Sequence, residues 1–468
     1  MVAVRIASSA TVKKIQKNIS VEPVVFLFCL SVTFSNSLNS SLLLYKSCSP
    51  DAMPHSIGSK CPNEASAEHQ VTPINAWKSV VMQLVPMFLT LLAGPWSDRH
   101  GRQRRSLMLL PIVGQLLADV ASLYSSVKWA YITPLMTAVL QVTMSATTGS
   151  TPLFNNGIFS YVSDTSDESW RTLKFGLVIC ATNLAGTFGM LAYGFIVEVM
   201  GFVDAFALCV VLDVLAFFLV LNYVKDTPEP YEHKPFSQDL KESLHVADIV
   251  KNSFRVLFKP RSGNKKTVLI LMILVCGPLT SVPSEGETSL MYMFLRNKFS
   301  FTDIDYSVFG SYRMLVVIIG TVITLGVMSH LLKVNDALIG LISCIFDFLS
   351  ELAFYFAKNS WQLYFIPPLQ IFLGAAISIT GSISSKCVEM NEMGTMHSVK
   401  LIIESVSKAI VLPMYNFLYN KTLETNPSAF YLISVVLVSL SFPFFFITYI
   451  LTRKNTKKEI SPIEYGTF

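Results

Sequence analysis

The stretch Gly94-Pro95-Trp96-Ser97-Asp98-Arg99-His100-Gly101-Arg102-Gln103-Arg104-Arg105 lies between two long apolar segments and decides the fold class. Lys and Arg resist transfer across a bilayer, so a short basic loop between two membrane-length segments is expected on the cytoplasmic side. The spacing predicts local structure as well. Gly94 would close one helix, Asp98 would lie near the membrane surface, and Gly101 with Arg102 would form a tight turn that carries a cation.

The composition is that of a membrane protein. Hydrophobic residues make up 52% of the 468 residues, charged residues make up only 14%, and the mean hydropathy is +0.51. A soluble domain carries about 25% charged residues. Twelve segments approach or exceed the roughly 20 residues with which a helix crosses a bilayer. They are Val21–Leu44, Ile74–Ala93, Ser106–Tyr124, Tyr131–Phe159, Phe175–Val199, Val203–Val224, Thr267–Phe294, Ser307–Leu332, Asp336–Phe356, Gln362–Ser385, Val399–Tyr419 and Phe430–Ile450.

Six of these spans lie on each side of a polar centre, which predicts an all-α membrane protein of two six-helix bundles, 21–224 and 267–450. The segment 225–266 between them is expected to be a cytoplasmic linker. The tails 1–20 and 451–468 are also expected in the cytoplasm, and 45–73 would form an external loop. Most of the 36 Lys and Arg residues fall in segments predicted to be cytoplasmic, which supports this orientation.

The predicted external loop carries the features of an oxidising compartment. Two of the eight cysteines, Cys48 and Cys61, share this loop, where a local disulfide between them is expected; the alternative is two free thiols. Asn39-Ser-Ser and Asn420-Lys-Thr are glycosylation sequons on the same predicted face, although Asn39 lies close to its span. We therefore predict a glycoprotein with one disulfide.

By its Gly, Asp, Gly and Arg spacing, the loop 94–105 resembles the signature between helices two and three of major facilitator transporters. Such transporters consist of two six-helix bundles related by an axis along the membrane normal, with substrate near the midplane between them. A related loop is expected in the second half, where Gly326-Val-Met-Ser-His-Leu-Leu-Lys333-Val-Asn-Asp336 is a degenerate counterpart. No phosphate-binding glycine-rich loop follows a predicted strand, so the sequence gives no support to ATP-driven transport.

The basic loop is also expected to act as a gate. Asp98 and Arg102 would pair with each other and with neighbouring helix ends, fastening the cytoplasmic side while the cavity faces out. A few kcal/mol of bias is enough to decide which state dominates. Gly101, Asp164 and Arg171 are further residues of this predicted cytoplasmic gate. Arg104 and Arg105 are instead expected to set the topology and to contact lipid phosphates.

Three places resemble solute carrier family 46, the family of the proton-coupled folate transporter, more closely than other carriers. They are Gly94-Pro-Trp-Ser-Asp98, then Ser160-Tyr-Val-Ser-Asp164 followed by Arg171-Thr172, and last Ser384-Ser-Lys386 leading to Glu392-Met-Gly394 and Glu404-Ser405. The Glu-Gly-Glu run of span seven is similar to that of insect members. The resemblance implies a major facilitator fold and a secondary transporter, typically a symporter.

The chain departs from the folate-carrying member in ways that bear on substrate. That member is expected to hold an acid in span five, a His in span seven and a basic residue in span ten, and Leu177–Val197, Thr267–Phe294 and Leu363–Ser385 lack these types. Its expected disulfide reaches the loop after span seven, whereas Arg296–Tyr306 has no Cys. The resemblance therefore transfers the fold and the transporter class, but not folate as the substrate.

Acids inside predicted spans are the candidates for proton coupling or substrate contact, because an ionisable group at the bilayer centre is expensive and usually faces a cavity or a partner. Glu285 and Glu287 come first, since Pro278 and Pro283 interrupt their span and predict a non-helical stretch on which the two carboxylates approach each other. The alternative is that both acids lie in water at the outer end of span seven.

Other polar residues in the spans complete the candidate set. Glu404 and Lys408 are four residues apart on one helical face, which favours either a mutual ion pair or a functional role. Arg313 would neutralise Glu285 or Glu287, or hold an anionic substrate. Asp119 is a further acid and Asn183 a neutral donor and acceptor. Asp347 and Glu351 in span nine are weaker candidates, because that span normally lies outside the cavity of this fold.

The sequence thus predicts a secondary active transporter of a small organic solute, an organic anion first, working by alternating access with proton coupling as a hypothesis. The alternative is a membrane receptor or scaffold that binds a ligand without transporting it. An enzyme is not expected, and neither is a metal, another cofactor or a nucleic-acid partner. Membrane lipids and a small-molecule substrate are the expected partners. The C-terminal Tyr465-Gly-Thr-Phe468 has the form of a sorting signal, so a multi-pass protein of the plasma or endolysosomal membrane is expected.

Overall fold

The computed structural model describes residues 21–54, 61, 63–99, 103–165, 168–226, 254–389 and 392–460. All regular secondary structure in these residues is helical. The first bundle consists of α2 (Glu22–Cys48), α3 (Glu64–Arg99), α4 (Arg104–Val127), α5 (Pro134–Thr147), α6 (Ser150–Thr165) and α7 (Glu168–Tyr223). The second consists of α10 (Lys265–Ile270), η1 (Leu271–Cys276), α11 (Gly277–Phe299), α12 (Asp303–Val322), η2 (Ile323–Leu331), α13 (Asp336–Phe356), α14 (Ser360–Leu363), η3 (Pro367–Phe372), α15 (Leu373–Lys386), α16 (Met393–Thr422) and α17 (Tyr431–Ile460).

The described chain crosses the membrane twelve times, as predicted. Nine helical stretches are long and apolar enough to cross on their own. One of them, Lys174–Tyr223, contains two spans. The non-helical backbone of Gly201 separates them, with a φ of 78° that a residue with a side chain rarely adopts. The pair α5 and α6 forms the fourth span, and α12 continues through η2 as the eighth. The predicted all-α fold of two six-helix bundles is confirmed.

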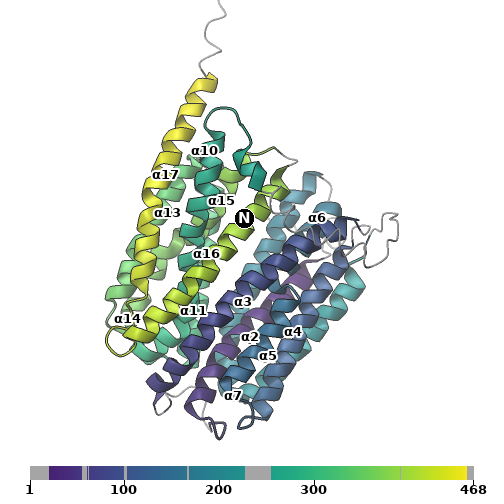
Figure 1. Cartoon of the computed structure of the whole chain (residues 1–468), viewed down its shortest axis with the longest axis vertical. Helices are drawn as coiled ribbons and strands as arrows, with labels where there is room; N and C mark the ends of the chain where they lie inside the picture. Colours follow the sequence, from purple (N-terminus) through teal and green to yellow (C-terminus); the bar gives the residue numbers. More distant parts are fainter. Residues whose placement is uncertain are drawn as a thin grey trace, which may run out of the picture.

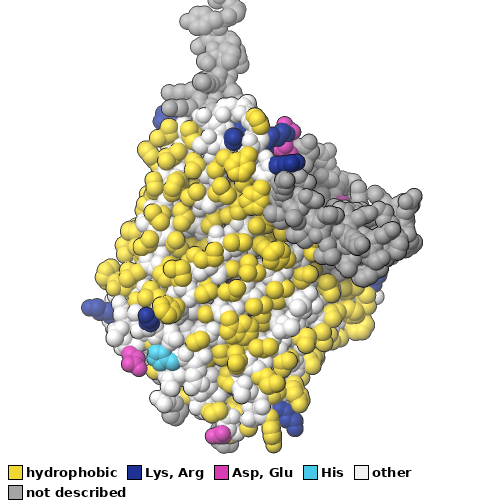
Figure 2. Space-filling view, viewed as in Figure 1, with side chains coloured by type: hydrophobic (Ala, Val, Ile, Leu, Met, Phe, Trp, Pro, Cys, Tyr) yellow, Lys and Arg dark blue, Asp and Glu magenta, His cyan; other side chains and the backbone are white. Residues whose placement is uncertain are grey.

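The surface matches a bilayer. On the face shown in Figure 2, apolar side chains cover the middle of the molecule, and charged side chains gather toward its two ends. The exposed large hydrophobic residues come from many of the spans, among them Phe88, Leu117, Phe188, Val211 and Phe417. Since lipid replaces water around these spans, exposed Phe and Leu carry no solvation cost there.

The two ends of the molecule are named here by what they carry. The disulfide face holds the bond between Cys48 and Cys61, whose Cα atoms are 6.1 Å apart. The linker face holds residues 254–266, the described end of the predicted linker, where α10 begins. The bundles meet along two helix pairs, α3 with α16 and α7 with α12, and the first pair runs side by side through the middle of Figure 1.

Span seven differs from the prediction. The prolines were expected to unwind it around Glu285 and Glu287, yet Gly277–Phe299 is one continuous α-helix that follows a π-helical turn at Leu271–Cys276. Pro278 lies in the first turn of α11, where its missing N–H would have had no partner in any case. Pro283 is buried within α11. Neighbouring helices in a membrane protein can compensate for the backbone hydrogen bond that a proline removes. The predicted non-helical stretch is wrong.

Candidate functional site

A polar bridge joins the two bundles in the middle of the membrane. Gln83 of α3 donates from Nε2 to Glu285 Oε1 of α11 at 2.6 Å. Lys408 of α16 pairs with Glu285 Oε2 at 2.5 Å. The Glu285 side chain is 41% exposed, so one carboxylate holds a partner on each bundle and still reaches open space. Of the three, Gln83 was not singled out from the sequence.

Glu285 and Glu287 do not meet. Residues two positions apart on an α-helix are rotated by about 200° about its axis, so the two carboxylates project from opposite sides of α11. Glu285 faces the first bundle, and Glu287 is buried inside the second. The expectation that the two acids approach each other is wrong, because it rested on unwound backbone.

Glu287 belongs to a buried acidic cluster with one cation. Arg313 of α12 lies 3.5 Å from Glu287 and also donates from Nε to Gln370 Oε1 at 2.6 Å. The carboxyls of Glu351 and Asp347, both on α13, lie against this pair. Of the two expected partners of Arg313, the structure therefore selects Glu287. Span nine, judged the weaker source of candidates, contributes to the same cluster.

Glu404 and Lys408 do not pair with each other. Glu404 lies 3.7 Å from Lys400, one turn earlier on α16, while Lys408 reaches across to α11. The i,i+4 rule holds for Lys400 and Glu404, but helix packing overrides it for Lys408. Asn183 is exposed on α7, and no hydrogen bond joins its side chain to another described residue.

The first bundle has a buried carboxyl pair. Asp119 of α4 accepts hydrogen bonds from Ser35 and from Gln115, the latter at 3.2 Å. Asp213, in the second leg of α7, lies against Asp119, and both are 0% exposed. Asp213 was not singled out from the sequence, although an acid within the apolar run Val203–Val224 is itself a signal.

An ion-pair network closes the disulfide face between the bundles. Arg296 at the end of α11 is 1% exposed and donates from Nε to Glu64 Oε1 of α3 at 2.9 Å. Its Nη1 lies 3.5 Å from Asp303 Oδ2. Its guanidinium stacks over the ring of Tyr45, 4.9 Å from the centroid. One arginine of the second bundle thus holds an acid and an aromatic ring of the first.

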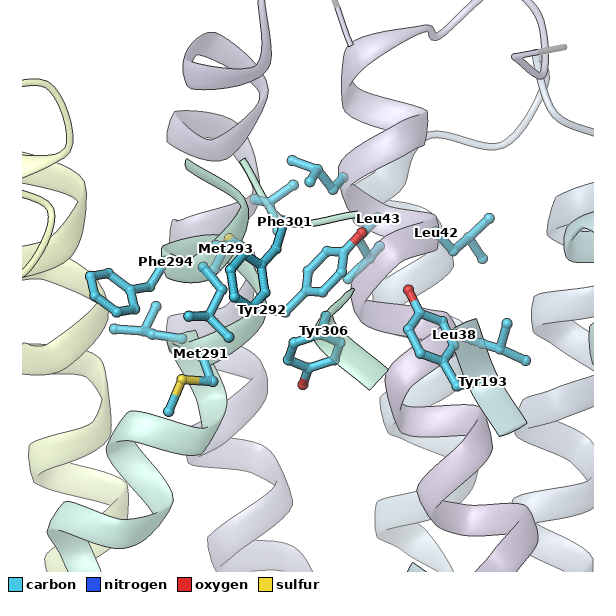
Figure 3. Packing of buried hydrophobic residues seen from close by; sticks show 14 of the residues in the cluster. Leu38, Leu42, Leu43, Tyr193, Met291, Tyr292, Met293, Phe294, Phe301 and Tyr306 are labelled. Carbon is cyan, nitrogen blue, oxygen red and sulfur yellow. The ribbon is translucent and has the colours of Figure 1, made fainter. Parts of the chain in front are cut away.

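Asp303 extends this network through three tyrosines. The hydroxyls of Tyr45, Tyr193 and Tyr292 all donate to its carboxylate, from α2, α7 and α11 respectively. Figure 3 shows Tyr193, Tyr292 and Tyr306 among the apolar side chains where α2 meets α11. A buried carboxylate that accepts several hydrogen bonds is well compensated for its loss of water. The network is therefore fit to hold the two bundles together.

Further contacts lie at the same end. Glu68 of α3 accepts hydrogen bonds from Tyr419 at 2.9 Å and from Asn297 at 3.3 Å, and His69 contacts Asn420. Every hydrogen bond or ion pair between two described residues that joins the bundles lies between the middle of the membrane and this face. Toward the linker face, Met87 and Leu91 of α3 pack on Ile402. The described structure is closed at the disulfide face.

Gly194 permits this closure. A Cβ atom there would lie 2.5 Å from the carbonyl oxygen of Asp303 and nearer still to Ser307 Oγ. We expect Gly194→Ala to force the disulfide face apart, since overpacking of this kind costs about 1–3 kcal/mol. Spin-label distances between α7 and α12 would measure the opening. Gly176→Ala is the matched control on the same helix, because nothing lies within 4 Å of the added atom. Equal behaviour of the two variants would contradict the prediction.

The linker face carries pairs within each bundle. Arg104 donates from Nε to Asp164 at 2.8 Å and from Nη1 to Ser97 at 3.1 Å, so it is a protein contact and not the lipid contact expected. Arg105 likewise donates to the carbonyl oxygen of Leu221. Gly101 and Arg102 lie outside the described residues, as do the side chains of Asp98 and Arg171.

The last residues of the predicted linker are attached to the second bundle. Glu392 pairs with Lys259 at 2.6 Å and with Arg261 at 2.7 Å. The hydrogen bond from Lys259, joined by that from Arg261, lowers the pKa of Glu392 below its usual value. A lowered folded pKa means that this attachment is complete above the ordinary Glu pKa and is lost only as the pH falls through the folded value.

One predicted modification is corrected. Asn39 is 0% exposed within α2, and its amide donates to the Ser35 carbonyl oxygen at 2.9 Å, so the expectation of a glycan there is wrong. The sequon signal failed because the span continues past it to Cys48. Asn420, near the end of α16, stays a predicted acceptor.

The Major Facilitator Superfamily model matches residues 24–412, which is most of the chain. The chain belongs to this superfamily. The probable peptidoglycan muropeptide transporter SLC46 of Drosophila melanogaster is 25% identical over 90% of this chain and 83% of its own. The lysosomal proton-coupled steroid conjugate and bile acid symporter SLC46A3 of Gallus gallus is 23% identical over 76% and 74%. The proton-coupled folate transporter of Rattus norvegicus is 24% identical over 73% and 71%.

These relatives confirm the resemblance to solute carrier family 46, and they are transporters rather than enzymes. Among solved structures, a peptide transporter POT in complex with sulfate superimposes with a TM-score of 0.67 at 11% identity, over 92% of this chain and 94% of its own. A POT family transporter in complex with 5-aminolevulinic acid gives 0.65 at 13% identity, over 92% and 96%. At such identities the likeness shows the fold alone. The protein is a multi-pass transporter of the major facilitator kind.

Proposed function

We propose that this chain carries a small organic anion by alternating access and that a proton moves with it. The observation that carries the proposal is Glu285, which holds Gln83 on one bundle and Lys408 on the other while its side chain stays partly open. A carboxylate in that position couples its own charge to the contact between the bundles. Transporters place their substrate and coupling ions near the midplane at this interface.

The closed disulfide face supports alternating access. Arg296, Asp303 and the tyrosines around them form one discrete arrangement that must break before the opposite state forms. Protonation of Glu285 would remove its attraction to Lys408 and so weaken the bridge between the bundles. Substrate would bind where Lys408 becomes available. The predicted gate at Asp98, Arg102 and Arg171 would close the linker face in the alternate state.

Two cations support an anionic substrate. Lys408 and the guanidinium of Arg313 lie in the second bundle within the membrane, and each has a carboxylate partner that competes with a substrate anion. The compounds in the names of the relatives, bile acids, steroid conjugates and folate, are also acidic organic molecules. An uptake screen of folates, bile acids and peptidoglycan fragments at two pH values would identify the substrate.

We expect Glu285→Gln to flatten the pH dependence of uptake in proteoliposomes, because the amide keeps the shape of the side chain but cannot take up a proton. Glu287→Gln is expected to change that dependence as well, by altering the charge of the Arg313 cluster. Glu424→Gln is the control, since that side chain is 77% exposed near the disulfide face. Wild-type pH behaviour in both variants would refute proton coupling through span seven.

A receptor or scaffold without turnover is the second candidate. The basic residues of the linker, Lys259 and Arg261 among them, offer a surface for other proteins. Counterflow in proteoliposomes separates the two candidates, because a carrier exchanges labelled for unlabelled substrate and a receptor does not. Binding without exchange would favour the receptor.

We place the protein in the plasma membrane or the endolysosomal membrane, with both termini in the cytoplasm. The lysosomal relative supports the second location. The sorting pattern at Tyr465–Phe468 lies outside the described residues. Imaging of a tagged chain with and without Tyr465→Ala would test the signal.

A further inference from the structure

The buried pair in the first bundle is not explained by packing. Asp213 is 0% exposed, and neither of its carboxyl oxygens has a hydrogen-bond partner in the described structure. The nearby hydroxyl of Ser31 donates instead to the carbonyl oxygen of Cys209 at 3.4 Å. What does lie against Asp213 is the carboxyl group of Asp119. Two carboxylates repel each other, whereas one carboxylic acid can donate to one carboxylate.

No described cation balances this pair. The polar groups near the two carboxyls come from α2, α4 and α7. They are the hydroxyls of Ser31 and Ser35, the amide of Gln115 and the thiol of Cys209. None of these carries a positive charge. An ionised side chain in the bilayer interior without a partner costs about 2.5–3.5 kcal/mol on insertion scales, and two adjacent ones cost more. The least expensive counter-charge for such a site is a proton.

The second bundle has a related arrangement at the corresponding place. Ser35, Asp119 and Asp213 belong to spans one, three and six. Glu287, Glu351 and Ser434, which contact one another, belong to spans seven, nine and twelve. Each half thus places buried carboxyls and a serine where its first, third and sixth spans meet. The serine lies on span one in the first half but on span twelve in the second, where Asp347 adds a third acid. The halves differ in charge, because Arg313 lies 3.5 Å from Glu287 and the first bundle has no described counterpart.

We propose that Asp119 and Asp213 form a proton-binding site of the first bundle, in which one proton is shared between the two carboxyl groups. Ser35 and Gln115 hold Asp119 as the acceptor, and Asp213, which lacks other partners, supplies the proton. The site gives the first bundle a proton of its own, separate from the bridge at Glu285. Its use in transport rests on the proposed function, but binding of the proton does not.

Infrared difference spectroscopy tests the binding on the full chain in lipid vesicles. We expect the carbonyl band of a protonated carboxylic acid at neutral pH, shifted in D2O. Asp213→Asn and Asp119→Asn should each reduce the intensity of this band by about the contribution of one carboxyl group. Asp204→Asn, on the same helix but exposed, should leave it unchanged. The band does not depend on transport. The infrared result can therefore support or refute the proton site whatever the uptake assay shows for Glu285.

A second measurement uses the wild-type protein, in case a variant fails to fold. Dicyclohexylcarbodiimide reacts with protonated carboxyls in apolar surroundings, and mass spectrometry should find the label on Asp119 or Asp213. Two results would overturn the proposal. One is an unchanged band in both folded variants together with no label on either acid. The other is protection from the label by sodium chloride but not by potassium chloride, which would make the site a sodium site.

Discussion

Replacing Arg296 with methionine should open the disulfide face and reduce transport to near background. Arg296 is 1% exposed and is the cation shared by Glu64 of one bundle and Asp303 of the other. Removing one partner of a buried ion pair costs about 3–5 kcal/mol, because the remaining charge stays buried without compensation. A change of that size moves the ratio of closed to open protein by more than about 100-fold.

Distances between spin labels on α3 and α11 would report this opening, and uptake in proteoliposomes would report its consequence. Lys298→Met is the matched control. Lys298 lies two residues further along the same helix end, but its amine bonds to Ser428 of its own bundle. If both variants left the distance distribution as in the wild type, the network at Arg296 would not be the element that holds the face closed.

Arg313→Met should cause the second large loss, in folded protein as well as in uptake. Three buried acids, Glu287, Asp347 and Glu351, would then share a site without a described cation. The expected cost is again about 3–5 kcal/mol. Gln370, the other partner of Arg313 at 2.6 Å, would lose its hydrogen bond too. Fluorescence-detected size-exclusion chromatography would measure the folded fraction.

A double variant makes this prediction specific. Adding Glu287→Gln to Arg313→Met removes the uncompensated charge and should restore most of the folded protein, since replacing both members of a buried ion pair is often nearly neutral. Glu285→Gln should not rescue Arg313→Met, because Glu285 pairs with Lys408 on the other side of α11. Rescue by Glu285→Gln, or none by Glu287→Gln, would contradict the assignment of partners.

The fold could be predicted from the sequence, because hydropathy, span length and the distribution of Lys and Arg can be read from each segment separately. These properties predict twelve membrane crossings and two bundles, and no tertiary contact is needed for that prediction. The break between spans five and six is also readable at Met200-Gly201-Phe202, where glycine allows a positive φ. What they do not predict is which side of a helix meets which neighbour. Asp119, Arg313 and Lys408 were therefore identified as candidates. Glu287 was one of two acids expected to pair with Arg313, but the acids next to Asp119 and Lys408 were not predicted.

The errors have common physical causes. Lys408 prefers a distant acid over the one in its own helix because α11 packs against α16 and brings Glu285 closer. Arg296 and Asp303 were read as loop residues, whereas the helices extend to them and bury both. Asp213 was overlooked in an apolar run, although every ionisable residue in a span warrants attention. Side chains at helix ends and single acids in spans depend on tertiary contacts that no local pattern contains.

The carboxylate of Asp303 ties together side chains from four places in the chain: Tyr45, Tyr193, Tyr292 and Arg296. In an evolutionary comparison of related sequences, these positions should therefore vary as a group. A lineage that loses the acid no longer needs the three hydroxyls, and phenylalanine should then replace tyrosine at little cost. Where the acid persists, each hydroxyl should persist with it. Sequence divergence would then record whether a given relative still closes this face in the same way.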